Sequence, residues 1–165
     1  MFSLKEKTAI ISGGSKGIGK AIALKYAKAG ANVVICSRKK DNLDSAIQEA
    51  KTAGFNIVGI ECNTGEIESI NNVVKKTIEQ FGRVDILVNN AAANPYYGPI
   101  LNSQDSHWEK IWDINVKGYF NFIRFIKDSR LVNILSSLSV LFFILNIIFC
   151  CWYVIHHFIN RRIKY

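Results

Sequence analysis

The chain of 165 residues lacks the features that mark secreted, disulfide-linked or metal-binding proteins. Its four cysteines follow neither a disulfide-framework spacing nor a metal-ligand spacing, so the sequence predicts no cystine scaffold and no metal site. The first ten residues, MFSLKEKTAI, are charged and contain no apolar signal-peptide core. These absences favour a reduced, non-secretory compartment for the N-terminal part of the chain.

Acidic residues are scarce, 13 against 21 Lys and Arg, which gives a net charge of +8. The lysines are scattered over the predicted helices, for example Lys20, Lys25 and Lys75, and are not clustered with interleaved aromatic residues. A nucleic-acid-binding protein would show that clustering, so nucleic acid is excluded as a predicted partner. The basic balance also suits a cofactor that carries several phosphate charges.

Charged residues are missing altogether from residues 131–160. This apolar segment is longer than the roughly 20 residues that cross a bilayer, so it predicts a long apolar helix and a candidate transmembrane span. Residues 161–165 form a basic tail, which the positive-inside tendency would put in the cytoplasm and the N-terminal part on the far side. That conflict leaves open the alternative that the apolar segment reflects a truncated or mis-spliced gene product.

Proline is rare, and Pro95 and Pro99 both fall in the predicted loop 90–102. Outside that loop, short apolar runs alternate with amphipathic segments whose apolar residues recur every three or four positions. The pattern predicts strands at Thr8–Ser12, Asn32–Cys36, Asn56–Glu61 and Val84–Asn89, and helices at Lys20–Ala29, Asn42–Ala53, Glu66–Phe81 and Ser103–Asp128. Such alternation is typical of an α/β fold with a doubly wound parallel sheet covered by helices.

Glycines gather between the first predicted strand and the first predicted helix. Without a Cβ, they let the backbone turn tightly and approach a pyrophosphate, which the helix N-terminus then binds through its free N–H groups. A plain turn is the alternative, but the order strand, glycines, helix is the one that phosphate binding requires. The predicted phosphate-binding residues are Ser12, Gly13, Ser15, Lys16, Gly17, Ile18 and Gly19.

The end of the second predicted strand lacks the acidic residue that would bind a ribose 2′-hydroxyl and select NAD(H). Arg38 stands there instead, with a planar fork that matches a 2′-phosphate, and Ser37 and Lys39 flank it. The sequence therefore predicts NADP(H) as the cofactor. The alternative is that Arg38 and Lys39 are solvated loop charges.

Three motifs together resemble the short-chain dehydrogenase/reductase superfamily: Gly13-x-x-x-Gly17-x-Gly19, Asn89-Asn90-Ala91-Ala92 and the helical segment 113–118. The resemblance covers roughly residues 1–127 and implies a Rossmann-type domain, here incomplete, over residues 1–130. It also implies that Asn63 contacts adenine, that Asn90, Ala91 and Ala92 border the adenosine ribose, and that Asn115 is a catalytic asparagine holding a water near the active-site lysine. The family has Asp at the position of Asn63 and Gly at that of Ala92.

Residues 90–100, taken with Cys36-Ser37-Arg38, look most like the dehydrogenase/reductase member 4 branch of that superfamily. Members of this branch are NADP(H)-dependent carbonyl and retinal reductases, often peroxisomal tetramers. The resemblance thus implies an oxidoreductase that interconverts carbonyls and alcohols, acting on a small carbonyl or alcohol substrate. It implies a cytoplasmic or peroxisomal location, whereas a true anchor at 131–160 would make the protein membrane-associated.

The catalytic Tyr-x-x-x-Lys pair of the superfamily is missing from the chain. Ser137 stands where the resemblance implies the catalytic serine, but Tyr153 is followed four residues later by His157. A neutral imidazole does not replace the lysine ammonium, which lowers the pKa of the catalytic tyrosine. The sequence therefore predicts impaired catalysis, with a non-catalytic NADP(H)-binding membrane-anchored protein and a truncated gene product as alternatives.

Overall fold

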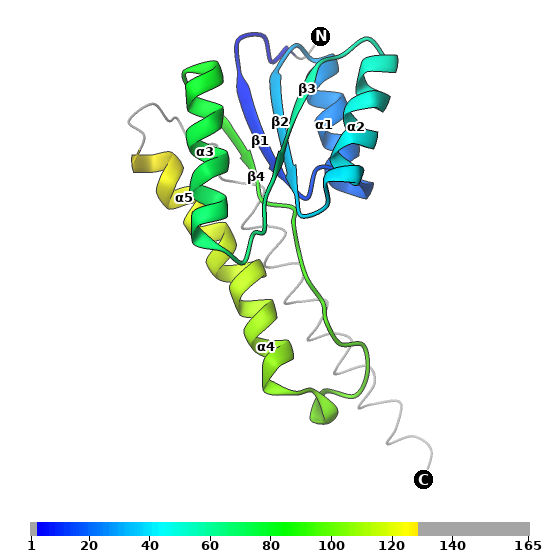
Figure 1. Cartoon of the computed structure of the whole chain (residues 1–165), viewed down its shortest axis with the longest axis vertical. Coiled ribbons are helices and arrows are strands. Elements are labelled where there is room, and N and C mark those ends of the chain that lie inside the picture. Colours follow the sequence, from blue (N-terminus) through cyan, green and yellow to red (C-terminus); the bar gives the residue numbers. More distant parts are fainter. Residues whose placement is uncertain (1–2, 129–165) are drawn as a thin grey trace. The chain divides into compact units, whose positions relative to one another are not determined.

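The computed structural model describes residues 3–128, in which strands and helices alternate (Figure 1). The strands of this part form one parallel sheet in the order β3-β2-β1-β4. Their bounds are β1 (Thr8–Ser12), β2 (Asn32–Ser37), β3 (Ile57–Glu61) and β4 (Ile86–Val88). The helices are α1 (Gly17–Lys28), α2 (Lys40–Thr52), α3 (Ile67–Phe81), α4 (Asp105–Ile111) and α5 (Gly118–Asp128), with the short segments η1 (Ile100–Asn102) and η2 (Trp112–Lys117).

The central strand β1 pairs with β2 on one side and β4 on the other. Ala9 lies opposite Val33 of β2 and Ile86 of β4, and every residue of β1 is buried. A parallel strand covered on both faces has to be apolar throughout, which the sequence of β1, TAIIS, almost is. The predicted doubly wound parallel sheet is confirmed for the described residues.

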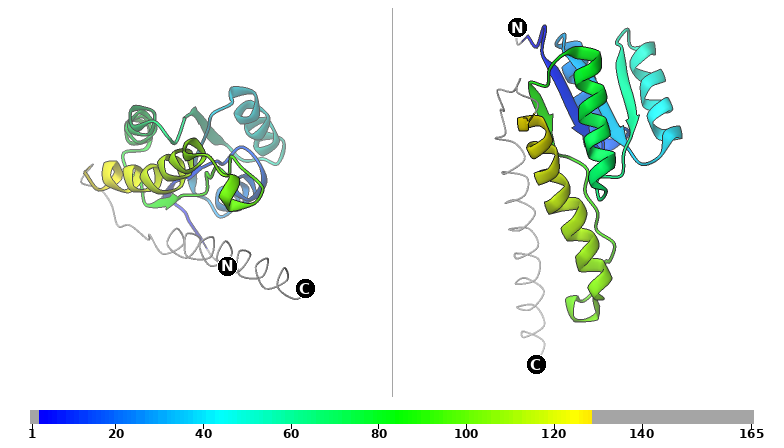
Figure 2. Two further views of the ribbon diagram at one scale, coloured as in Figure 1. Left: turned by 90° about the horizontal axis from the view of Figure 1, so that it is seen from below. Right: turned by 60° about the vertical axis from the view of Figure 1, so that its left-hand side comes forward.

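Helices cover both faces of the sheet (Figures 1 and 2). On one face, Leu43 and Ala46 of α2 and Ala23 of α1 pack with Ile11 and Ile35. On the other face α5 lies against α3, and Phe122 is the largest side chain that is fully buried. The apolar core on this face, between the sheet and the helices α3 and α5, also contains Ile10, Val34, Ile70, Val73 and Ile126.

Several predicted boundaries were wrong. Helix α1 begins at Gly17, three residues before the predicted Lys20, because glycines of the turn already form its first turn and carry no apolar signal. Strand β4 is limited to Ile86–Val88, inside the predicted Val84–Asn89, and the polar residues Asp85 and Asn89 stand on either side of it. The predicted single helix Ser103–Asp128 is divided by the π-helical segment η2, a local widening that sequence periodicity does not reveal.

Some predicted features lie outside the described residues. These are the apolar helix and candidate membrane span at 131–160, the basic tail at 161–165, and the positions of Ser137, Tyr153 and His157. Among residues 3–128, no helix combines the length and apolar character that crossing a bilayer requires.

A buried carboxylate fastens the start of β1 to the segment before β4. Asp85 accepts a hydrogen bond of 2.9 Å from the Thr8 N–H and forms ion pairs with Arg83 and Lys7. Burial opposes the charge of Asp85, but the Thr8 N–H and the two cations outweigh burial and hold its pKa below the ordinary value.

Asp85→Asn is expected to lower the free energy of unfolding by about 1–2 kcal/mol at pH 7, because charge-assisted hydrogen bonds are lost. Since the pKa of Asp85 is lowered in the folded state, its stabilisation is present above the unfolded pKa of about 3.9 and is lost as the pH falls through the folded value. Urea unfolding of the full chain at several pH values measures both effects. The exposed Asp44→Asn is the control, and an equal loss in both variants would contradict the role of Asp85.

Candidate cofactor site

A cleft of about 340 Å³ opens at the carboxyl ends of the strands, where the chain order reverses between β1 and β4. Open α/β sheets bind ligands at this switch point, because the loops after the two strands diverge there. The lining residues come from the loops that follow the four strands, from the end of β2, from α2 and from η2: Gly13, Ser15, Ser37, Arg38, Lys39, Asn42, Cys62, Thr64, Asn90, Ala91, Ala92, Ala93 and Ile114.

The glycine turn needs glycine at Gly13 for two reasons. Its φ of +66° lies in the left-handed region, and an added Cβ would come within 2.9 Å of Ala91 Cα and Asn90 Nδ2. Gly17 is also left-handed, with φ of +54°, but an added Cβ there would meet no atom within 4 Å. Gly17 thus borders open space, while Gly13 lets the turn lie directly against the loop after β4.

The N-terminus of α1 carries no capping side chain and no acidic residue in its first turn. The first N–H groups of a helix have no partner within the helix, so they are available to an anion together with the positive end of the helix dipole. Lys16 precedes this helix and is exposed. Helices α2 and α3, in contrast, have Asp41 and Glu68 in their first turns.

The hydroxyl of Ser12 joins the glycine turn to the loop after β4. It accepts hydrogen bonds of 3.0 Å from the N–H groups of both Asn90 and Ala91, and it lies 3.3 Å from the Val88 carbonyl oxygen, to which it donates. The side-chain amide nitrogen of Asn90 donates hydrogen bonds to the carbonyl oxygens of Ser12 at 3.0 Å and Gly13 at 3.2 Å. Ser12 and Asn90 therefore act as positioning residues for the two walls of the cleft.

Ser12→Ala is expected to cost about 1–3 kcal/mol of unfolding free energy, because two backbone N–H groups lose their acceptor in a buried place. Ser12→Thr keeps the hydroxyl and serves as the matched control. Urea unfolding of the full chain measures the difference. A change in the alanine variant no larger than that in the threonine variant would show that water replaces the hydroxyl.

The mouth of the cleft is positive. Arg38 and Lys39 are exposed there and make no ion pair with any residue of the described part, and no carboxylate lines the cleft. The buried Ser37 hydroxyl beside them has no hydrogen-bond partner within residues 3–128. A buried hydroxyl without a partner is costly, so this group fits a ligand that offers an acceptor.

Two of the predicted site residues are engaged in holding backbone. Asn115, in the π-helical segment η2, accepts a hydrogen bond of 2.8 Å from the Ala93 N–H and donates one of 3.0 Å to the Ala93 carbonyl. Asn63 lies beside the cleft, where its amide oxygen accepts the Gly65 N–H at 3.2 Å and its amide nitrogen donates to the Glu66 carboxylate at 2.7 Å. The catalytic role of Asn115 and the adenine contact of Asn63 stay predictions.

The sequence did not indicate several residues that line the cleft, namely Asn42, Cys62, Thr64, Ala93 and Ile114. Two glycines offered the available signals for Thr64 and Ile114. A Cβ at Gly118 would come within 2.5 Å of the Thr64 carbonyl oxygen and one at Gly65 within 3.4 Å of Ile114, so these glycines allow η2 and the start of α5 to approach the loop after β3. Thr64 and Ile114 thus form a side of the cleft that contains no residue of the predicted nucleotide-binding motifs.

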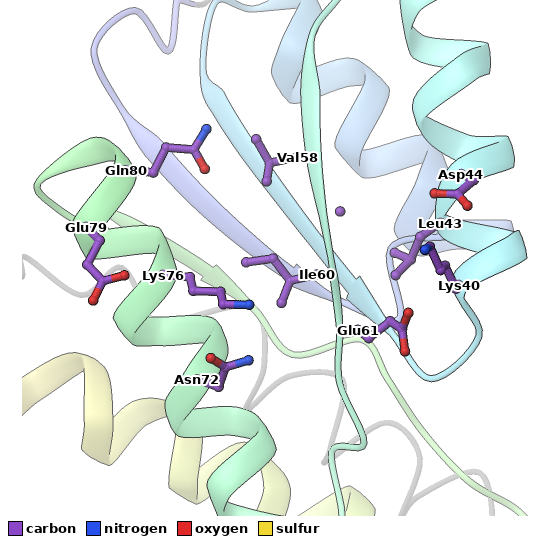
Figure 3. Close-up of a pocket in the computed structure, with 11 residues that line it drawn as sticks. Lys40, Leu43, Asp44, Val58, Ile60, Glu61, Asn72, Lys76, Glu79 and Gln80 are labelled. Carbon is purple, nitrogen blue, oxygen red and sulfur yellow. The ribbon is translucent and has the colours of Figure 1, made fainter.

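A second cavity, of about 720 Å³, lies over the edge strand β3 between α2 and α3 (Figure 3). Its apolar floor comes from Val58 and Ile60 of β3 and Leu43 of α2. Charges of both signs surround that floor: Lys40, Asp44, Glu61, Lys76 and Glu79. Mixed charge and the lack of a glycine turn distinguish this cavity from the cleft at the switch point.

Comparison with known proteins agrees with this geometry. The family described as short chain dehydrogenase matches residues 7–145. The chain belongs to the short-chain dehydrogenase family. The cleft at the switch point, with its glycine turn after β1, is therefore the candidate nucleotide site of a family member.

Relatives of the chain within the family include plant and mammalian proteins. The Arabidopsis thaliana short-chain dehydrogenase/reductase SDRA is 41% identical over 114 residues, which are 69% of this chain and 45% of that protein. The Homo sapiens dehydrogenase/reductase SDR family member 4 is 40% identical over 114 residues, 69% of this chain and 41% of that protein. The chain thus spans less than half the length of these relatives, and the member 4 branch that the motifs indicated is among them.

Solved structures of the family superpose on the chain. A metagenomic short-chain oxidoreductase in complex with NADP has a TM-score of 0.72 at 28% identity, over 76% of this chain and 57% of that one. The L-sorbose reductase from Gluconobacter frateurii, complexed with NADPH and L-sorbose, has a TM-score of 0.72 at 31% identity, over 78% of this chain and 49% of that one. The Rossmann-like fold of the described residues is therefore that of the family.

Proposed function

We propose that this chain is an NADP(H)-binding member of the short-chain dehydrogenase family whose nucleotide-binding domain occupies residues 1–130. The observation that carries the proposal is the charge of the cleft, which has Arg38 and Lys39 at its mouth and no carboxylate among the residues of 3–128 that line it. Two family structures with NADP or NADPH bound, at 28% and 31% identity, support the same choice of nucleotide.

The residues present fit the phosphate groups of this nucleotide. The turn from Gly13 to Gly19 and the uncapped N-terminus of α1 would hold the pyrophosphate. Ser37, whose hydroxyl lacks a partner among the described residues, would hold the 2′-phosphate together with Arg38 and Lys39. When bound, the nicotinamide supplies a hydride, and the chain's own contribution is to bind and orient it.

We further propose that the chain on its own does not reduce carbonyl compounds or oxidise alcohols, the chemistry that the family resemblance implies. None of the five tyrosines from Tyr26 to Tyr153 is followed four residues later by lysine, so none of them carries the Tyr-x-x-x-Lys motif whose ammonium lowers the pKa of the tyrosine for proton transfer. The assignments of Ser137 to catalysis and of residues 131–160 to a membrane helix stay predictions.

Calorimetric titration of the purified full chain with NADPH and with NADH tests the proposal. Saturable NADPH binding at least about tenfold tighter than NADH binding is expected, because one phosphate–guanidinium contact contributes at least 1.4 kcal/mol. Equal affinities would contradict selection by the 2′-phosphate, and no binding would contradict the nucleotide site itself. Loss of NADPH absorbance with a panel of small carbonyl compounds should not exceed the rate without protein.

A further inference from the structure

Two buried thiols lie at neighbouring strand ends beside the cofactor cleft. Cys36 is the second-last residue of β2, and Cys62 directly follows β3; they are 0% and 2% exposed. Cys36 lies opposite Ile60, so Cys62, two residues further, points to the same face of the sheet. Both belong to the apolar cluster under α3 and α5, but Cys62 alone of the pair lines the cleft.

The two thiols differ in character. The Cys36 thiol hydrogen-bonds to Cys62, which lowers the pKa of Cys62 despite its burial and raises that of Cys36. The Ser69 hydroxyl, which accepts the Asn63 N–H at 3.0 Å, also hydrogen-bonds to Cys62 and lowers the pKa of its thiol further. Because Cys62 lines the cleft and Cys36 does not, Cys62 is the thiol that a peroxide in the cleft reaches, and Cys36 is its resolving partner.

We propose that a peroxide joins Cys36 and Cys62 in a disulfide that closes the cofactor cleft, and that a dithiol reductant restores the two thiols by thiol–disulfide exchange. The Cys62 thiolate attacks one peroxide oxygen, the O–O bond breaks, and a sulfenic acid forms while the leaving hydroxide takes up a proton to become water. The Cys36 sulfur then attacks the Cys62 sulfur and releases a second water. The two thiols lose two electrons, and these reduce one peroxide to two waters.

The disulfide acts on the glycine turn because Cys36 supports it. The Cys36 carbonyl oxygen accepts the N–H groups of Gly13 at 2.8 Å and Gly14 at 3.3 Å. A disulfide needs Cα atoms within roughly 4.4–6.8 Å of each other, and Cys62 is offset by two residues from the strand partner of Cys36. Forming the bond therefore draws the ends of β2 and β3 together and displaces the carbonyl that holds the phosphate-binding turn.

The effect on NADPH rests on the proposed function, whereas the disulfide itself does not, and the experiment reads them separately. The reduced full chain is treated with hydrogen peroxide and digested, and mass spectrometry identifies a linked peptide pair that holds Cys36 and Cys62. In parallel, NADPH affinity is measured before oxidation, after it, and after dithiothreitol. We expect the linked pair, a loss of NADPH affinity of at least about tenfold, and recovery on reduction.

Cysteine variants distinguish the two steps of disulfide formation and exclude the other cysteines of the chain. Cys36→Ser is expected to stop at a Cys62 sulfenic acid that dimedone traps, and Cys62→Ser is expected to keep its NADPH affinity in peroxide. Replacing Cys150 and Cys151 by serine, which leaves the pair intact, should preserve the response.

An unmodified Cys62 after peroxide overturns the disulfide, and a linked pair with unchanged NADPH affinity overturns the closure. A reduced chain that binds no NADPH overturns the proposed function, and the peptide map alone then decides whether the disulfide forms.

Discussion

Replacing Arg38 by alanine is expected to weaken NADPH binding about 10- to 100-fold while NADH binding stays within about twofold, because charge-assisted hydrogen bonds to a phosphate contribute roughly 1.5–3 kcal/mol. The reason is local: Arg38 is exposed at the mouth of the cleft and makes no ion pair within residues 3–128, so its guanidinium is available to the ligand. Calorimetric titration of both nucleotides measures the effect.

A matched control separates recognition from net charge. Arg124→Ala removes the same charge from α5, where the guanidinium lies over the Phe120 and Phe125 rings, and should leave both affinities unchanged. Arg38→Lys should fall between parent and alanine, since an ammonium replaces the charge but not the planar fork. If Arg38→Ala weakens NADPH and NADH equally, the residue is a solvated loop charge and does not select the 2′-phosphate.

Phe122→Ala is expected to have the largest effect on stability, a loss of about 3–5 kcal/mol of unfolding free energy. Phe122 is 0% exposed and lies in the layer where α5 covers α3 and the sheet. Removing the ring leaves a cavity that the surrounding helices fill only in part. Urea unfolding of the full chain, followed by circular dichroism, measures the loss.

Phe120→Ala is the matched control, because Phe120 belongs to the same helix but is 60% exposed. It should cost less than about 1 kcal/mol, as surface truncations usually do. Equal losses in the two variants would mean that α5 does not pack through Phe122. The core variant should also weaken NADPH binding, because α5 continues η2, which carries Ile114 of the cleft and the Asn115 contact with Ala93.

Much of the fold followed from periodicity. The apolar runs at β1, β2 and β3 and the amphipathic stripe of α3 were predicted within two residues of their bounds, because burial of a strand or a helix face leaves a pattern in the sequence. The π-helical segment at Trp112–Lys117 could not be predicted, since it shows no periodicity of its own and its Asn115 bonds Ala93 in another part of the chain. The start of α1 was missed because glycines give no apolar pattern.

The lining of the cleft was predictable where motifs carry a backbone requirement. The glycine turn and the ends of parallel strands lie at one edge of the sheet, so residues in these motifs reach the cleft. Among the predicted residues that line it are Gly13, Ser37, Arg38, Lys39, Asn90, Ala91 and Ala92. Cys62, Thr64 and Ile114 were not predicted, since they reach the cleft through the packing of η2 against the loop after β3. Asn63, predicted from the resemblance, has its amide hydrogen-bonded within its own turn.

The bonds between Ser12 and Asn90 also bear on how the protein folds. They join residues 78 positions apart, whereas the β1–β2 ladder joins residues only 24 positions apart. Long-range closure carries a larger entropy cost, so the β1–α1–β2 unit can form before β4 docks, and the cleft is completed late. A ligand that binds only the completed cleft raises the stability of the chain by RT ln(1 + [L]/Kd). Bound nucleotide would therefore slow unfolding chiefly by holding β4 in place. The largest decrease in the rate of amide hydrogen exchange would then be at Val88 and Asn90.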